Sequence, residues 1–225
     1  MKRLLFFLAW VMFGFSGHQA FALPSLQLDI GGGYYNQSGN PLYDTETVIA
    51  SSPQFTLYAL MNPTRKTTLA DTYYLSMALF SSPGSTGDTG SFVFNGRAID
   101  IDQDMLYGNP GLPGHGIYNT NYLVYNFNFD PENMVGKYNV QDKPGGFGQP
   151  GSGLYYAAFN VDTGGLGNGF SIHFDLYDGK TNAPFSHDAQ SMAMESHNSI
   201  PEPATVLLLA SGLAGLIGFR RARQS

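Results

Sequence analysis

The sequence predicts an all-β domain, an antiparallel β-sandwich or jelly roll, between two terminal segments of a different kind. Three observations predict it. Apolar and aromatic runs of strand length recur along the chain, clusters of glycine, proline and asparagine separate them, and no stretch outside the two ends keeps a helical period. The predicted domain covers residues 23–181, which is the length of one domain. A signal helix is expected before it and a single transmembrane helix after it.

Two segments alternate between apolar and polar residues, as a strand with one buried face does. In residues 122–130, one face is expected to carry Leu123, Tyr125, Phe127 and Phe129, and the other Asn126 and Asn128. In residues 170–178, the apolar residues Phe170, Ile172, Phe174 and Leu176 are expected in the core. The residues between them, Ser171, His173, Asp175 and Tyr177, are expected to face outward. Further strands are expected at residues 26–30, 55–61, 73–80, 91–95, 98–102 and 154–161. Glycine-rich turns are expected at residues 108–116, 145–153 and 162–169.

The N-terminus has the three parts of a secretory signal peptide. Lys2 and Arg3 precede an apolar run at residues 4–15, and Ala20 and Ala22 form an Ala-x-Ala site. Cleavage is expected before residue 23, so signal peptidase and the secretion machinery are predicted partners. A permanent N-terminal membrane span is the alternative, but the apolar run is short and a small-residue site follows it.

The last 25 residues combine a short polar motif, an apolar run and a basic end. The motif is Pro201, Glu202 and Pro203, the apolar run covers residues 204–219, and the basic end is Arg220, Arg221 and Arg223. The run is slightly shorter than the roughly 20 residues that cross a bilayer comfortably. It predicts a transmembrane helix whose arginines stay in the cytoplasm, which places the domain on the opposite side. An ordinary buried C-terminal helix is the alternative.

These C-terminal residues resemble the PEP-CTERM sorting signal of Gram-negative bacteria. The resemblance implies that an exosortase-type enzyme recognises the motif, cuts near it and releases the domain. It also implies an exported protein, anchored in the inner membrane on the periplasmic side before processing and then at the cell surface or extracellular. Such proteins are often associated with extracellular polysaccharide. If the tail is never cut, the protein stays a single-pass membrane protein.

Residues 182–200 separate the last expected strand from the tail. They mix serine, histidine, asparagine and methionine without a period, which predicts a flexible tether. His187 and His197 lie in this segment and are expected to be solvated side chains.

The charge of the domain and tether, residues 23–200, restricts its partners. Two of the 11 basic residues lie in the signal peptide and three in the tail, and one of the 17 acidic residues lies in the tail. The remaining six basic and 16 acidic residues give a net charge of −10. This argues against nucleic acid or anionic lipid as a partner. The chain has no cysteine, which excludes disulfides and thiol chemistry.

The body carries a second resemblance. Residues 26–32, 55–59, 113–118, 170–178 and 183–189 resemble the choice-of-anchor N family. Members of that family share an extracellular domain and differ in the C-terminal sorting device. The resemblance brings no established activity with it.

One acidic motif could bind a cation. Asp100, Asp102 and Asp104 form Asp-x-Asp-x-Asp, which resembles the start of a calcium loop. An EF-hand is excluded, because Met105 and Gly111 occupy the positions that require glycine and glutamate. A solvated acidic strand face is the favoured alternative. Calcium is the only cofactor that the sequence suggests.

No pattern indicates an enzyme. The chain lacks a nucleophile elbow, and His115 between two glycines is expected to be an ordinary loop residue. The tyrosine pairs at residues 34–35, 73–74 and 155–156 could stack on sugar rings if one member faces outward, although packing within the protein is favoured. The predicted function is therefore a structural or carbohydrate-binding matrix protein. A polysaccharide-active hydrolase is the competing hypothesis, and it requires two carboxylates and a histidine that converge in a cleft.

Overall fold

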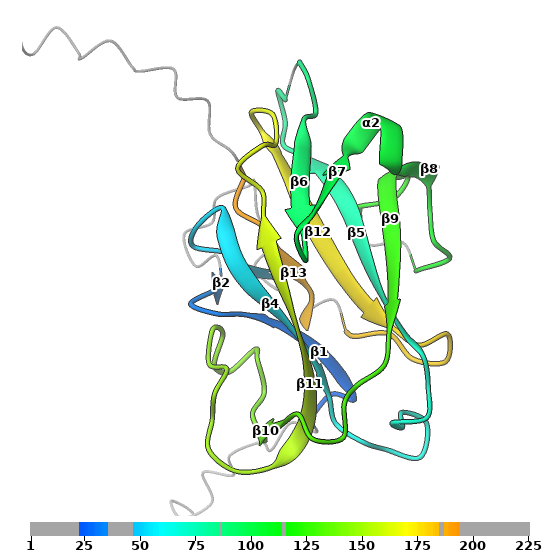
Figure 1. Ribbon diagram of the computed structural model, residues 1–225, viewed down its shortest axis with the longest axis vertical. Helices are drawn as coiled ribbons and strands as arrows, with labels where there is room; N and C mark the ends of the chain where they lie inside the picture. The colour runs from blue at the N-terminus through cyan, green and yellow to red at the C-terminus, as the bar shows by residue number, and fades with distance from the viewer. Residues whose placement is uncertain (1–22, 36–46, 86, 114–115, 185–186, 194–225) are drawn as a thin grey trace, which may run out of the picture.

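Thirteen strands form two sheets in the described part of the chain (Figure 1). The computed structural model describes residues 23–35, 47–85, 87–113, 116–184 and 187–193. Sheet A has the order β1-β4-β11-β6-β7, with β10 added on β11: β1 (Leu26–Ile30), β4 (Gln54–Met61), β11 (Gly153–Asp162), β6 (Ser91–Phe94), β7 (Arg97–Asp100) and β10 (Met134–Gly136). Sheet B has the order β2-β3-β13-β12-β5-β9-β8: β2 (Tyr34–Tyr35), β3 (Val48–Ile49), β13 (Ala189–Gln190), β12 (Phe170–Tyr177), β5 (Tyr73–Ser81), β9 (Thr120–Phe127) and β8 (Leu106–Gly108).

The predicted all-β character is confirmed. Every strand pair is antiparallel except β13 with β3, which is parallel. The one helix among the described residues is α2 (Ile101–Asp104), and none of them forms a helix that is long and apolar enough to cross a membrane. The predicted signal helix and C-terminal helix lie outside the described residues.

The core lies between the two sheets, and aromatic rings join them. Phe55 of β4 packs edge-on against Phe174 of β12, with ring centroids 6.1 Å apart. Phe159 of β11 likewise packs against Phe127 of β9 at 5.1 Å. Alternate residues along each strand point between the sheets, as the sequence period predicts. Burial of this apolar layer is the main stabilisation of a domain without disulfides.

The β6–β7 hairpin shows how local sequence sets a turn. Asn95 and Gly96 connect the strands, with φ of 49° and 79°. Positive φ at both central residues is the type I′ geometry, which matches the twist of a two-residue hairpin. The hairpin extends sheet A beyond β11.

The outer face of sheet A is covered at one end by the loop of residues 137–149. Asp29 of β1 is fully buried there and accepts hydrogen bonds from the Tyr138 hydroxyl (2.7 Å) and the Gly145 amide (2.7 Å). Gly145 has φ of 65°, and a Cβ at this residue would lie 2.6 Å from the Gly33 carbonyl oxygen, so only glycine allows this approach. Phe147 of the same loop stacks on Tyr58 at 3.5 Å. The loop is thus fastened to β1 and β4.

Burial raises the pKa of Asp29 above its usual 3.8, although the hydrogen bonds from Tyr138 and Gly145 oppose this. The unfolded chain therefore loses this proton at a lower pH than the folded one. Below about pH 4, protonated Asp29 should contribute its full stabilisation of the folded state. As pH rises from about 4 through the raised pKa, this stabilisation should be lost and the free energy of unfolding should fall. Asp29→Asn should remove this dependence. Urea unfolding of both proteins between pH 3 and 8 measures it, and parallel pH curves would contradict the prediction.

The predicted tether is wrong for residues 187–193. β13 lies in the interior of sheet B, between β12 and β3, and its two residues are at most 2 % exposed. The side-chain amide of Gln190 donates to Ser171 Oγ. The backbone N–H of Ile172 donates to Ser191 Oγ. The sequence did not reveal this strand because it is only two residues long, and its burial depends on partners distant in the chain. The domain therefore extends beyond residue 181.

The outer face of β12 also differs from its prediction. Ser171, His173 and Asp175 do point away from the core between the sheets, but they are only 0 %, 2 % and 4 % exposed. Both faces of this strand are buried, so sequence alternation correctly separates its two faces without showing that the polar one is covered. A buried polar layer of this kind requires partners within the protein.

Candidate functional site

Three ionisable side chains converge on the outer face of β12. His173 and Asp175 are two residues apart on this strand and therefore share a face. β13 pairs with β12 so that Gln190 lies opposite His173 and Ala189 opposite Phe174. One further step in the same register places Asp188 opposite Asp175. The sheet thus brings residues from two separate segments to one place.

The side chains are close and almost fully buried. His173 Nε2 lies 3.4 Å from Asp175 Oδ1 and 3.8 Å from Asp188 Oδ2. The side chains of His173, Asp175 and Asp188 are 3 %, 6 % and 3 % exposed. One potential ligand atom from each side chain lies within 4.8 Å of the other two. Among the residues that the structure describes, no other group of three His, Cys, Asp or Glu side chains is arranged so that it could hold a metal ion. We refer to these three residues as the HDD cluster.

Tyr118 orients one member of the HDD cluster. Its hydroxyl donates to Asp175 Oδ2 at 2.6 Å and lies 2.8 Å from Ser76 Oγ, which therefore donates to it. Burial, together with the negative charge of Asp175, raises the pKa of Tyr118 far above its ordinary value. The phenol therefore stays protonated and serves as a donor. With Oδ2 held in this way, Asp175 Oδ1 is the oxygen directed at His173.

Two carboxylates and an imidazole can hold a cation or transfer a proton. The sequence identified His173 and Asp175 only as outward-facing residues and took Asp188 as part of a tether. The His-x-Asp alternation within a strand was the available signal for the first two. Nothing local indicated Asp188, because its proximity results from strand pairing.

His187 is buried rather than solvated, contrary to its prediction. It is 3 % exposed, and its Nε2 lies 2.6 Å from Asn139 Oδ1. Loss of solvation lowers its pKa to about 4, so the ring is neutral near pH 7. It links the segment before β13 to the loop of residues 137–149. His115 and His197 lie outside the described residues.

The predicted calcium residues have local roles at the start of α2. The expected strand over residues 98–102 ends at Asp100, whose carboxylate accepts the Asp102 and Gln103 amides. Asp104 Oδ2 accepts the Asp100 amide, and its Oδ1 lies 3.7 Å from Arg97. Asp102 is exposed. Two of the three carboxylates are therefore engaged within this turn, and calcium binding here stays a prediction.

Replacing the helix cap tests this local role. Asp100→Ala should lower the free energy of unfolding by about 1 kcal/mol, because two amides at the start of α2 lose their acceptor. Asp102→Ala, at an exposed carboxylate in the same motif, is the matched control and should change it by less than about 0.5 kcal/mol. Denaturant unfolding without calcium measures both. Equal losses in the two variants would exclude a specific capping role.

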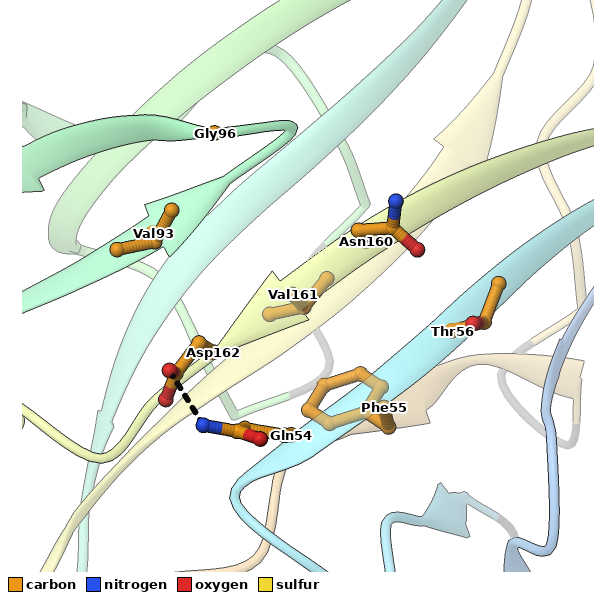
Figure 2. Close-up of a pocket in the computed structure, with 8 residues that line it drawn as sticks. All are labelled: Gln54, Phe55, Thr56, Val93, Gly96, Asn160, Val161 and Asp162. Atoms are coloured by element: carbon orange, nitrogen blue, oxygen red, sulfur yellow. Dashed lines mark hydrogen bonds between the residues drawn. The ribbon is translucent and has the colours of Figure 1, made fainter.

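A second feature is an open hollow of about 400 Å³ on the outer side of sheet A (Figure 2). It extends across β4, β11 and the β6–β7 hairpin. Its polar side chains are Gln54 and Thr56 from β4 with Asn160 and Asp162 from β11. Gln54 Nε2 donates to Asp162 Oδ2 at 2.9 Å, which joins the two strands at one end of the hollow. The surface offers both donors and acceptors to a polar ligand.

The tyrosines mainly pack within the protein. Tyr73 is fully buried and donates to the Thr68 carbonyl, whereas its neighbour Tyr74 stacks on Tyr177 with centroids 5.4 Å apart. The exposed large aromatic residues of the described chain, Tyr34, Tyr107 and Tyr125, belong to β2, β8 and β9. No two of these three are register partners. The described exposed tyrosines therefore do not form a continuous row on one sheet.

Comparison with known proteins identifies the C-terminal segment. Residues 199–223 match the model of the PEP-CTERM protein-sorting motif. The chain carries a PEP-CTERM sorting motif. This motif implies an exported protein that an exosortase-type enzyme processes. Neither curated proteins nor solved structures give a significant match. The choice-of-anchor N resemblance stays a prediction.

The PEP-CTERM match covers all the predicted sorting residues. Pro201, Glu202 and Pro203 and the arginine cluster fall within residues 199–223, although these residues lie outside the described structure. The signal cleavage residues Ala20 and Ala22 also lie outside it, and the signal peptide stays a prediction.

Proposed function

We propose that this chain is an exosortase-processed component of the cell envelope or extracellular matrix, with a non-catalytic β-sandwich that serves a structural or carbohydrate-binding role. The PEP-CTERM motif at residues 199–223 carries the proposal. The N-terminal signal peptide brings the chain to the membrane, and the apolar run of residues 204–219 holds it on the periplasmic side until processing. The compact, acidic domain is then released to the cell surface or the medium.

Intact-mass measurement in the native host tests the sorting. The wild-type protein should begin at residue 23 and lack the apolar tail. Glu202→Ala should stay in the membrane fraction, because the processing enzyme reads the motif. Glu195→Ala, at an acidic residue upstream of the matched segment, should be processed normally. A full-length C-terminus on the wild-type protein would instead make it a permanently anchored single-pass membrane protein.

The hollow on sheet A supports carbohydrate binding. A sugar chain carries many hydroxyl groups, and the amides of Gln54 and Asn160 with the carboxylate of Asp162 supply short donors and acceptors for them. The hollow is open, so a polymer could cross it rather than being enclosed.

Affinity electrophoresis in gels that contain the host's extracellular polysaccharide tests this surface. The double variant Gln54→Ala with Asp162→Ala should lose most of the retardation. Gln141→Ala, at an exposed amide in the loop of residues 137–149, should migrate as the wild type does. Equal retardation of all three proteins would contradict binding at the hollow, and no retardation of the wild type would favour a purely structural role.

The polysaccharide-hydrolase hypothesis has one specific observation in its favour. Two carboxylates and a histidine converge in the HDD cluster, and both carboxylates approach the same nitrogen. Their exposures of 3–6 % mean that a substrate would reach them only after the covering residues move. Release of reducing ends from the host polysaccharide by the wild type, lost in Asp175→Asn, would establish the enzyme. No release supports the non-catalytic proposal.

A further inference from the structure

We propose that His173, Asp175 and Asp188 bind one divalent transition-metal ion, Zn²⁺ or Mn²⁺. This ion would hold β13, the last described strand, against its neighbour β12 in sheet B. This site is separate from the acidic motif at residues 100–104 and from the hollow on sheet A. It does not depend on carbohydrate binding.

The distances between the side chains suit a shared ion. His173 Nε2 lies 3.4 Å and 3.8 Å from the nearer oxygens of Asp175 and Asp188, and all three atoms fit within 4.8 Å. Ligand atoms around a tetrahedral Zn²⁺, each about 2.0–2.2 Å from it, are roughly 3.4 Å apart. Small side-chain adjustments would therefore place the three atoms around one ion.

The strand register supplies an independent argument. β12 and β13 pair at Phe174 with Ala189, and the next step in this register places Asp175 opposite Asp188. Like charges directly across a strand pair are destabilising, and burial at 4 % and 2 % exposure strengthens the repulsion. A divalent ion shared by the two carboxylates would offset this repulsion.

Tyr118 supplies the second layer that metal sites commonly have. Carboxylates that bind a metal are usually hydrogen-bonded through their other oxygen, which fixes their orientation. Asp175 shows this arrangement, since Tyr118 holds Oδ2 and Ser76 in turn holds Tyr118. Oδ1 is left pointing toward His173 at 3.4 Å.

The donor set selects the class of ion. Imidazole nitrogen favours Zn²⁺ and similar ions, carboxylate oxygen favours Mn²⁺ as well, and Ca²⁺ and Mg²⁺ prefer oxygen ligands alone. One nitrogen with two carboxylates therefore suits Zn²⁺ or Mn²⁺ better than Ca²⁺. Because Asp188 directly precedes β13, the ion would stabilise the end of the domain that leads to the sorting motif at residue 199.

Metal content tests the proposal on the full chain. The protein is purified in detergent, stripped with EDTA, dialysed against Zn²⁺ or Mn²⁺ and analysed by elemental mass spectrometry. The wild type should hold about one ion per chain. Asp188→Asn and His173→Gln should lose more than about a hundredfold in affinity. Asp29→Asn, at a buried aspartate that also accepts a tyrosine hydroxyl, is the matched control and should bind as the wild type does.

Two further measurements keep the test decisive if the ligand variants fail to fold. EDTA should lower the Tm of the wild type, and Zn²⁺ or Mn²⁺ should restore it. Tyr118→Phe, which leaves all three ligands in place, should weaken binding by about 10–100-fold. A wild type that holds neither ion and whose Tm ignores EDTA would overturn the proposal and leave the HDD cluster as a buried ion pair. Binding of Ca²⁺ alone would overturn the assignment of the ion.

Discussion

A chain truncated after Thr181 is expected not to fold, whereas a chain truncated after Ala193 is expected to fold with the stability of the longer protein. The first truncation ends at the domain boundary that the sequence predicts and removes β13 from the interior of sheet B. It leaves β3 without one of its two neighbours. It also leaves the buried Ile172 amide without Ser191 and the Ser171 hydroxyl without Gln190. Each buried polar group that loses its partner costs about 1–3 kcal/mol, against a total stability of about 5–15 kcal/mol.

Circular dichroism and thermal unfolding of the two truncated chains, compared with the chain that has its tail, measure this effect. The chain ending at Thr181 should show no cooperative transition. The chain ending at Ala193 is the matched control, because it lacks the same tail and retains β13. A cooperative transition at the same temperature in both would restore the tether interpretation of residues 182–200.

Phe174→Ala is expected to lower the free energy of unfolding by about 3–5 kcal/mol, the range for removal of a large buried aromatic side chain. Phe174 is fully buried on the core face of β12, and its ring packs edge-on against Phe55 of the other sheet. Alanine would leave a cavity between the sheets, which the surrounding strands can fill only partly.

Denaturant unfolding of the purified domain measures the Phe174→Ala effect. Tyr107→Ala serves as the control, since Tyr107 is also an aromatic strand residue but is 77 % exposed on the edge strand β8. It should change the free energy of unfolding by less than about 0.5 kcal/mol. A loss below 1 kcal/mol for Phe174→Ala would mean that the two sheets do not pack as the structure shows.

The Phe174 experiment and the metal experiment address opposite faces of β12. Phe174 faces the core, while His173 and Asp175 on either side of it belong to the HDD cluster on the outer face. Loss of Phe174 should therefore reduce stability with or without EDTA. Loss of Asp188 should reduce stability mainly when Zn²⁺ or Mn²⁺ is present, because the variant cannot gain from the ion. This difference separates core packing from metal binding.

Features that depend only on residues close together in the sequence were predictable from the sequence alone. The alternation in residues 170–178 correctly separated the two faces of β12, because side chains along a strand alternate by geometry alone. The sorting motif was also readable, since its three parts are contiguous and the match at residues 199–223 covers them. The acidic motif shows the limit of this approach. Its spacing suggested a cation site, which stays a prediction, but did not show that Asp100 and Asp104 also form hydrogen bonds at the start of the short helix.

The tertiary structure decided which polar residues are buried and which of them meet. Asp188 lies in a segment without periodicity, and only its pairing beside β12 places it opposite Asp175 and close to His173. Asp29 likewise meets Tyr138 and Gly145 through a loop more than 100 residues away in the sequence. Sequence patterns report the local period of a chain, whereas burial and side-chain convergence depend on contacts between distant segments. For this protein the sequence alone determined its β character and its sorting motif, and only the folded sheets brought the HDD cluster together.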